Sequence, residues 1–322
     1  MKALITDYGF PDVSQEKDIL ARAGIAVETA QCKKPDDVIA AAHGADALLV
    51  QWAPITRNVI AALDQCKIIV RYGIGVDNVD LQAAGERGIP VCNIPDYCIG
   101  EVADHSLSLA LSLARQLPQT DAAVRTGAWK IIPPSPFPAF RDTLLVTVGF
   151  GRIARAVLAR ARPFGFQLAA YDPYVEEAVF IAAGIRKLDR YELFREAGIL
   201  SLHLPLTSET RHLVDRDSLA LMKRDSIVVN TARGGLIDTM ALAQALIAGK
   251  IAGAGIDVFE EEPLPGDHPL RTAPNVLLTS HTAWYSAGSI PILQRKAAEE
   301  VVRGLKHQPL QNVANRKFLV ST

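Results

Sequence analysis

Short apolar runs alternate along this chain with segments in which apolar residues recur at helical spacing. In the first hundred residues the apolar runs lie at 2–6, 26–29, 47–50, 68–71 and 90–93. The helix-like segments between them lie at 14–23, 36–42, 57–62 and 80–87. Repeated alternation of this kind predicts an α/β fold with a parallel sheet covered on both faces.

A second alternating region extends over residues 144–278. Its predicted strands end near Gly149, Asp172, His203, Asn230, Asp257 and Thr279. Before this region, residues 102–117 form a helix-like segment that is apolar on nearly all sides, which predicts burial. A proline-rich connection at 131–138 is predicted to be extended, and residues 289–306 are predicted to close the chain with a helix.

The most specific local pattern is Gly149-x-Gly151-x-x-Ala154, which lies between a predicted strand and a predicted helix. The first glycine permits a tight turn, the second lets the backbone approach a pyrophosphate, and the small third residue lets helix and strand pack closely. Asp172 follows Gly151 by 21 residues and ends the next strand. Its carboxylate suits the ribose hydroxyls of NAD and would repel the 2′-phosphate of NADP. An ordinary turn with a solvated Asp172 is the simpler alternative, and the complete strand–helix–strand context disfavours it.

Composition limits the function classes. The 322 residues suggest about two domains of ~150 residues. With 34 basic and 35 acidic residues and no basic stripe, direct nucleic-acid binding is disfavoured. No apolar run reaches ~18 residues and the start lacks the apolar core of a signal peptide, so neither a membrane span nor secretion is expected. The four cysteines form no Cys-x-x-Cys pair, which favours reduced thiols and a cytoplasmic location, and no spacing indicates a metal site.

Three segments near predicted strand ends carry reactive side chains. They are 230–238 with Arg233 and two glycines, 257–263 with Glu262, and 279–284 with His281. Arginine can bind a planar carboxylate through two N–H groups. Histidine titrates near neutral pH, and a partner carboxylate can orient it and stabilise its protonated form. These residue types suit the interconversion of a 2-hydroxy acid and a 2-oxo acid, with NAD carrying the hydride.

Together these motifs resemble the D-isomer-specific 2-hydroxyacid dehydrogenases. The resemblance spans nearly the whole chain and rests on residues 71–80 and 93–95, the glycine pattern and the three segments above. The run 281–286 is most similar to the branch that includes the C-terminal binding proteins, which are dehydrogenase-like transcriptional corepressors.

The resemblance implies roles for particular residues. His281 would protonate the carbonyl oxygen, Glu262 would keep His281 protonated, and Arg233 would bind the substrate carboxylate. The substrate-binding residues would be Arg71, Tyr72, Ile74, Gly75 and Trp284. The cofactor-binding residues would be Val102, Gly149, Phe150, Gly151, Arg152, Ile153, Ala154, Asp172, His203, Leu204, Pro205, Thr207, Thr210, Thr231, Ala232, Arg233, Asp257 and His281. Asp257 would bind the nicotinamide carboxamide.

The resemblance also implies an architecture. A flavodoxin-like parallel-sheet substrate domain would comprise residues 1–98 plus 288–322. A Rossmann-type NAD-binding domain would be inserted at 99–287 and would form a homodimer. If Trp52, Tyr72 and Trp284 face the substrate, its side group is expected to be apolar or small.

The chain departs from the family pattern at Ala154, at Asp142 where glycine is usual, at Gly198 where an acid is common, and at Ser280 where proline is common. Simpler interpretations also exist for single residues. Arg233 could neutralise a strand-end acid, and the acidic run 260–262 could be a solvated surface from which only the family register selects Glu262. Two other functions remain open: a 3-phosphoglycerate dehydrogenase of the same family, and an NAD-sensing corepressor-like binding protein.

Overall fold

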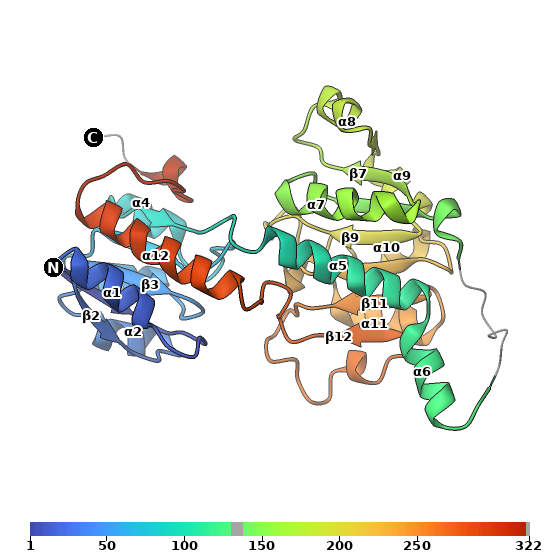
Figure 1. The fold of residues 1–322 in the computed structure, drawn as a ribbon, viewed down its shortest axis with the longest axis horizontal. Helices are drawn as coiled ribbons and strands as arrows, with labels where there is room; N and C mark the ends of the chain where they lie inside the picture. The colour runs from blue at the N-terminus through green and yellow to red at the C-terminus, as the bar shows by residue number, and fades with distance from the viewer. Residues whose placement is uncertain (130–137, 320–322) are drawn as a thin grey trace. The chain divides into compact units, whose positions relative to one another are not determined.

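The computed structural model describes residues 1–129 and 138–319 and divides into two compact units (Figure 1). Unit 1 consists of Met1–Cys98 and the C-terminal segment that begins at Tyr285. Unit 2 is the intervening segment Ile99–Trp284. Apart from Pro138, the proline-rich segment expected to be extended lies outside the described residues.

Unit 1 contains a five-stranded parallel sheet in the order β2-β1-β3-β4-β5, which is a flavodoxin-like order. Its strands are β1 (Lys2–Ile5), β2 (Ala26–Thr29), β3 (Ala47–Val50), β4 (Ile68–Arg71) and β5 (Val91–Cys92). Its helices are α1 (Ser14–Arg22), α2 (Pro35–Ala41), α3 (Arg57–Ala62), α4 (Leu81–Glu86) and α12 (Ser289–Leu305). The alternation predicted from the sequence for this region is therefore confirmed.

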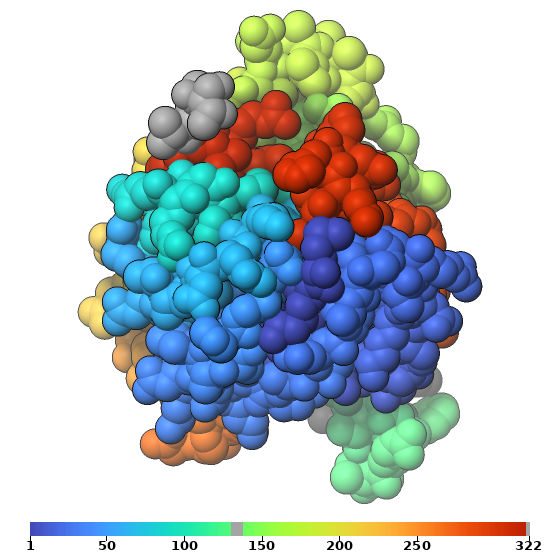
Figure 2. Space-filling model, turned by 90° about the vertical axis from the view of Figure 1, so that its left-hand side faces the viewer, coloured from blue at the N-terminus to red at the C-terminus, as the bar shows by residue number. Residues whose placement is uncertain are grey.

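The C-terminal segment is a structural part of unit 1. Helix α12 packs against α1, β3 and β4, and Figure 2 shows this segment, in red, beside the N-terminal residues in dark blue. Asn315 is fully buried, accepts a hydrogen bond from the backbone N–H of Val91 at 2.9 Å and donates one to the carbonyl of Ile89 at 2.9 Å. These bonds attach the end of the chain to the edge strand β5.

Unit 2 contains a seven-stranded parallel sheet in the order β12-β11-β10-β9-β6-β7-β8. Its strands are β6 (Leu144–Val148), β7 (Gln167–Tyr171), β8 (Arg186–Lys187), β9 (Ile199–Leu202), β10 (Ile227–Asn230), β11 (Gly253–Ile256) and β12 (Val276–Leu278). Its helices are α5 (Ile99–Ala114), α6 (Leu117–Arg125), α7 (Arg152–Ala161), α8 (Glu177–Ala183), α9 (Arg190–Glu196), α10 (Arg216–Leu221) and α11 (Thr239–Ile247). The chain order changes direction between β6 and β9, which is where open α/β sheets bind ligands.

Both faces of this sheet are buried, which explains why its central strands β6, β9, β10 and β11 are mostly apolar and do not alternate regularly with polar residues. Along β10, Ile227 and Val229 belong to one apolar cluster, and Val228 belongs to the cluster on the other face. Helices α5 and α7 pack together on one side, and α9, α10 and α11 are grouped on the other (Figure 1). The burial predicted for the apolar helix at 102–117 is confirmed for α5, which begins three residues earlier and ends at Ala114. It is wrong for Leu117, which begins α6 and is 54% exposed.

Strand β8 was not predicted, because its two residues, Arg186 and Lys187, are both charged and give no apolar signal. The four cysteines are free and buried, in agreement with the expectation of reduced thiols. No helix among residues 1–129 and 138–319 is long and apolar enough to cross a membrane.

Close packing against the C-terminal segment predicts a stability effect at Gly85. A Cβ on Gly85, in α4, would lie 2.5 Å from Phe318 Cβ and 2.6 Å from the Phe318 carbonyl oxygen. Because one of these atoms is backbone, it can move aside only if the C-terminal segment around Phe318 moves with it. We expect Gly85→Ala to lower the free energy of unfolding by ~1–3 kcal/mol. Thermal unfolding measures the change. The control is Gly288→Ala, whose Cβ would only touch Ser286 Oγ at 3.7 Å; equal melting temperatures for the two variants would contradict the argument.

Candidate active site and nucleotide site

The glycine turn after β6 has the geometry that a dinucleotide site needs. Gly149 has φ of +96°, and a Cβ there would lie 2.5 Å from the backbone oxygen of His203. Around Gly151, the residue that precedes helix α7, a Cβ would meet nothing within 4 Å. Because the first N–H groups of a helix lack partners within the helix, this open space at the start of α7 fits a phosphate. Ala154 is fully buried, as the close packing of helix and strand requires.

Asp172 lies directly after β7 and holds this turn in place. Its Oδ2 accepts a hydrogen bond from the backbone N–H of Phe150 at 2.9 Å, and its Oδ1 accepts one from Tyr174 at 3.0 Å. Each carboxylate oxygen can accept a further bond. The residues at this turn therefore fit the phosphates and a ribose diol of NAD.

The other predicted cofactor residues lie on neighbouring elements of unit 2. Val102 is buried in α5, and Thr231 follows β10 with its hydroxyl 2.7 Å from that of Ser106. His203 follows β9, with Nε2 2.8 Å from Ser201 Oγ, and burial lowers the pKa of its imidazole to about 3, so that the ring is neutral. In the segment after it, the Thr207 backbone N–H donates to Thr210 Oγ1 at 2.8 Å. Among the residues the structure describes, no group of three His, Cys, Asp or Glu side chains could hold a metal ion.

The loop that carries Arg233 begins where β10 ends. The Asn230 side chain accepts a bond from Ala232 N–H at 3.0 Å and donates one to the Arg233 carbonyl at 2.8 Å, which folds the loop back on the strand end. A Cβ on Gly234 would lie 1.9 Å from the carbonyl carbon and oxygen of Phe259. Only glycine therefore lets this loop press against the segment that leads to Glu262.

His281 and Glu262 form a close pair. His281 Nδ1 lies 2.7 Å from Glu262 Oε2, and the side chains are 33% and 37% exposed. An ionised carboxylate only accepts hydrogen bonds, so Nδ1 donates and Nε2 is the nitrogen that can exchange a proton with a ligand. The other oxygen of Glu262 accepts a bond from Phe259 N–H at 2.9 Å.

Charges at this pair favour an ionised Glu262. Its partial burial would raise the pKa of Glu262, but the hydrogen bond and charge of His281, the Phe259 N–H and the charge of Arg233 outweigh burial and lower it. The backbone of His281 has φ of +55°, a left-handed conformation that is costly outside glycine and typical of functional sites. The structure thus brings Arg233, Glu262 and His281 together in unit 2.

Asp257 fixes the loop that carries His281. Its carboxylate is fully buried and accepts bonds from Thr279 Oγ1 at 2.5 Å, from Thr282 N–H at 2.9 Å and from Ala283 N–H at 3.0 Å. His105, on α5, adds a contact from Nε2 to Thr279 Oγ1 at 3.0 Å. Sequence reasoning missed His105 because it lies 174 residues before Thr279 and no short motif links them. The predicted bond from Asp257 to a nicotinamide carboxamide stays a prediction.

The predicted substrate residues of unit 1 lie where β4 ends. The Arg71 guanidinium covers Gly73, where a Cβ would lie 1.5 Å from Nη1. The Ile74 carbonyl accepts a bond from Asn93 Nδ2 at 2.6 Å, and Ile74 and Gly75 are half-buried. Tyr72 is only 1% exposed and its hydroxyl donates to Glu16 at 3.0 Å, so we leave it out of the candidate site. Trp284, the last residue of unit 2, is half-buried.

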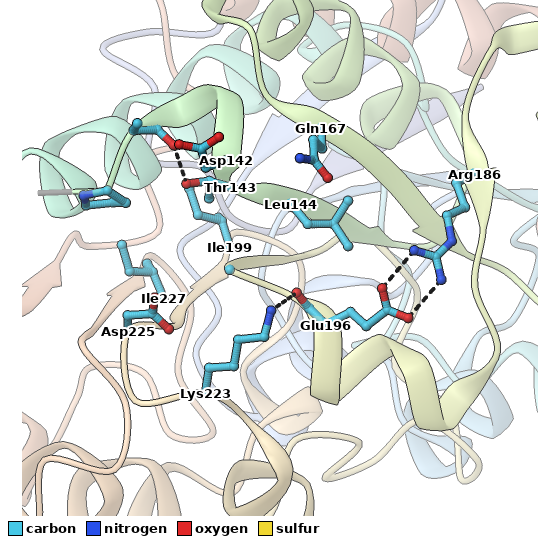
Figure 3. A pocket seen from close by; sticks show the side chains of 13 residues that line it. Asp142, Thr143, Leu144, Gln167, Arg186, Glu196, Ile199, Lys223, Asp225 and Ile227 are labelled. Atoms are coloured by element: carbon cyan, nitrogen blue, oxygen red, sulfur yellow. Dashed lines mark hydrogen bonds and ion pairs between the residues drawn. The ribbon is translucent and has the colours of Figure 1, made fainter.

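Figure 3 shows a pocket at the amino ends of the strands of unit 2. The residues described so far in unit 2 lie at or beyond the opposite, carboxyl ends of its strands or in α5. It is lined by the first residues of five strands: Leu144, Gln167, Arg186, Ile199 and Ile227. No predicted site residue lines it. Asp142 and Gly198, two of the departures from the family pattern, lie there, and none of Arg233, Glu262 and His281 does.

Comparisons with known proteins agree with this geometry. Residues 107–283 match the family model described as "D-isomer specific 2-hydroxyacid dehydrogenase, NAD binding domain". The chain is 39% identical over 98% of its length to D-3-phosphoglycerate dehydrogenase of Methanocaldococcus jannaschii, but it spans only 59% of that protein. It is 36% identical to glyoxylate reductase of Korarchaeum cryptofilum, covering 83% of this chain and 81% of the relative.

A solved structure is similar over nearly the whole chain. D-lactate dehydrogenase from Aquifex aeolicus, in complex with NAD and lactic acid, has a TM-score of 0.86 and 26% identity, with 95% of this chain and 96% of that one covered. The fold class predicted from the sequence is confirmed, and the relatives named here are dehydrogenases and a reductase, the class of enzyme that the sequence predicts.

The open space at Gly151 predicts a specific loss of cofactor binding. In Gly151→Val the side chain would fill the space assigned to the phosphates, and the φ of −77° is accessible to valine. We expect the Kd for NADH, measured by its fluorescence on binding, to rise about tenfold or more, since this is the closest approach of backbone to pyrophosphate. Gly266→Val is the control because Gly266 also has open space around it. Unchanged NADH affinity in the folded Gly151 variant would contradict the assignment of the pyrophosphate to this turn.

Proposed function

The chain belongs to the D-isomer-specific 2-hydroxyacid dehydrogenase family, and we propose that it reduces a 2-oxo acid to the D-2-hydroxy acid with NADH. The observation that carries the proposal is the His281–Glu262 pair at 2.7 Å, with Arg233 close enough for its charge to act on Glu262. An acid/base, its partner and a carboxylate-binding cation are the groups that this reaction requires of the protein.

Each of these side chains has a definite task in the proposed mechanism. NADH, when bound, supplies the hydride. Arg233 binds the substrate carboxylate and orients the carbonyl group. His281 donates the proton on Nε2 to the carbonyl oxygen, and Glu262, through Nδ1, stabilises the imidazolium before the transfer and fixes the plane of the ring. In the reverse direction His281 takes the proton from the hydroxyl group.

The strand ends of unit 1 favour an unphosphorylated substrate. Asp7, after β1, is buried and accepts bonds from the backbone N–H groups of Gln51 and Trp52, at 3.1 and 2.6 Å. The indole of Trp52 lies against Gly9 and is 52% exposed. Arg71 is the only cation in the segments 6–9, 51–53 and 71–75. A phosphate group would require several donors, whereas an exposed indole suits an apolar side group.

A second candidate is 3-phosphoglycerate dehydrogenase activity, favoured by the 39% identity to the M. jannaschii enzyme. The 36% identity to a glyoxylate reductase favours the unphosphorylated class. The relatives described above are named as dehydrogenases and a reductase, so the nearness to the corepressor branch stays a prediction, as does the cytoplasmic location.

We also propose that the protein is a homodimer that buries α6. This helix has nine residues and none of them is buried, and Figure 1 shows it standing away from the sheet of unit 2. Helices shorter than ~12–15 residues are marginal in water without tertiary packing. Leu117 and Val124 lie seven positions apart, and so on one face, and are 54% and 53% exposed, while Trp129 beyond the helix is 79% exposed. A second copy of the chain is the proposed partner.

Steady-state kinetics test the catalytic proposal. Oxidation of NADH is followed with glyoxylate, pyruvate, phenylpyruvate and 3-phosphohydroxypyruvate. We expect the unphosphorylated acids to be preferred, His281→Ala to lower kcat by ~10²–10⁴-fold, and Arg233→Ala to raise KM for the acid. His43→Ala, at a solvent-facing histidine, is the control. Full activity in folded His281→Ala would refute the mechanism, and a higher kcat/KM for the phosphorylated acid would favour the second candidate.

Light scattering tests the dimer. The wild-type chain is expected at twice its monomer mass of 34.8 kDa. Replacing both Leu117 and Val124 by Glu places two charges in the proposed apolar contact and is expected to yield monomers. The control is Ile181→Glu, on α8, where the side chain is 70% exposed. A monomeric wild type, or dimers that persist in the α6 variant, would contradict the proposal.

A further inference from the structure

A cluster of four polar side chains, which we call the Glu260 cluster, lies beside the catalytic pair in unit 2. It consists of His212, Thr239, Glu260 and His268. Glu260 Oε1 lies 2.6 Å from His212 Nε2, and Oε2 accepts bonds from Thr239 Oγ1 at 2.7 Å and Thr239 N–H at 3.0 Å. His268 Nε2 lies 3.2 Å from Thr239 Oγ1. Glu260 is therefore held by three bonds, although the acidic run suggested a solvated side chain.

The hydrogen bonds of the cluster all converge on the carboxylate. His268 Nδ1 accepts a bond from Leu270 N–H at 3.2 Å, so its proton is on Nε2, which donates to Thr239 Oγ1. Thr239 then donates its own proton to Glu260. Partial burial of Glu260 would raise its pKa, but the bonds from Thr239 and His212 outweigh burial and lower it. Because Thr239 is the first residue of α11, the carboxylate also lies at the positive end of that helix.

The Glu260 cluster connects the loops that carry two of the catalytic side chains. The Arg233 loop presses Gly234 against the Phe259 carbonyl, and the Phe259 N–H binds Glu262. His212 reaches the same region twice, because its backbone N–H donates to the Gly235 carbonyl at 2.8 Å while its ring binds Glu260. A displacement of the 259–260 peptide would therefore move Arg233 and Glu262 together.

We propose that Glu260 is a positioning residue that holds the Arg233 loop and the Glu262 segment in register for the reaction. The inference rests on the proposed function, because it assigns Glu260 to the same active site. His212 and Glu260 are 40% and 31% exposed. Since half-exposed ion pairs add little to global stability, the geometry of the catalytic loops is the property that this contact controls.

Glu261 provides a matched control. It neighbours Glu260, has the same charge and is exposed. No hydrogen bond or ion pair of Glu261 is found within the described part of the chain. The variants Glu260→Ala, Glu260→Gln and Glu261→Ala therefore compare a held acid with a solvated one on the same segment. His212→Ala removes only one of the three bonds and serves if Glu260→Ala does not fold.

Kinetics provide the first measurement. We expect Glu260→Ala to raise KM for the 2-oxo acid and lower kcat/KM by about tenfold or more, as small misplacements of catalytic groups do. The Kd for NADH should stay within about twofold, because the glycine turn is not part of the cluster. Glu260→Gln, which keeps an acceptor for Thr239, should recover most of the loss, and Glu261→Ala should equal the wild type. Equal kinetics in folded Glu260→Ala and Glu261→Ala would overturn the inference.

Hydrogen exchange provides a second measurement that does not depend on activity. In Glu260→Ala, or in His212→Ala, we expect faster exchange in the peptides that cover 232–236 and 257–263, and no change with Glu261→Ala. Unchanged exchange would also overturn the inference. If the wild type reduced none of the 2-oxo acids while exchange rose as expected, the proposed reaction would fail and the positioning of the loops by Glu260 would stand.

Discussion

The backbone pairing of a parallel sheet that is buried on both faces constrains everything else in unit 2. Strands β6, β9 and β10 have apolar clusters on both faces, so a charged side chain within them would lose its water. Charged side chains are therefore confined to the strand ends. Asp172, Arg233, Asp257 and His281 all lie at or just beyond the carboxyl ends, and the pocket at the amino ends contains none of them.

At the carboxyl ends of the strands, hydrogen bonds of carboxylates replace the regular ladder as the means of fixing side chains. Asp257 binds the hydroxyl of Thr279 and two backbone N–H groups of the loop that carries His281. Glu262 binds His281 on one side and Phe259 on the other. Since an unpaired buried carboxylate is costly, the bonds of Asp257 also penalise displacement of the loop that carries His281. The position of the His281 ring thus depends on two carboxylates: Glu262, which touches the ring, and Asp257, which fixes the loop.

Glycines allow two loops of unit 2 to pack directly against the backbone of other segments. Gly149 needs its positive φ and the missing Cβ to pass the His203 carbonyl, and Gly234 needs the missing Cβ to reach Phe259. The first of these was evident in the sequence because it belongs to a spaced motif. The second was visible only as a turn signal, because the atom that excludes a side chain there belongs to a residue 25 positions later in the chain.

Local pattern determined most of the elements and the identity of the reactive side chains. Strand runs, helix spacing and the glycine turn depend on residues a few positions apart, and a side chain's chemistry is its own, so Arg233 and His281 could be proposed before any fold was known. Glu262 was selected from the acidic run 260–262 only by the family resemblance. Tertiary structure decided which groups meet. It buried Tyr72 against Glu16, brought His105 to Thr279, and showed that Glu260 is held by His212 while Glu261 is exposed. Contacts between residues far apart in sequence depend on how loops and strand ends pack, and no local periodicity encodes that packing.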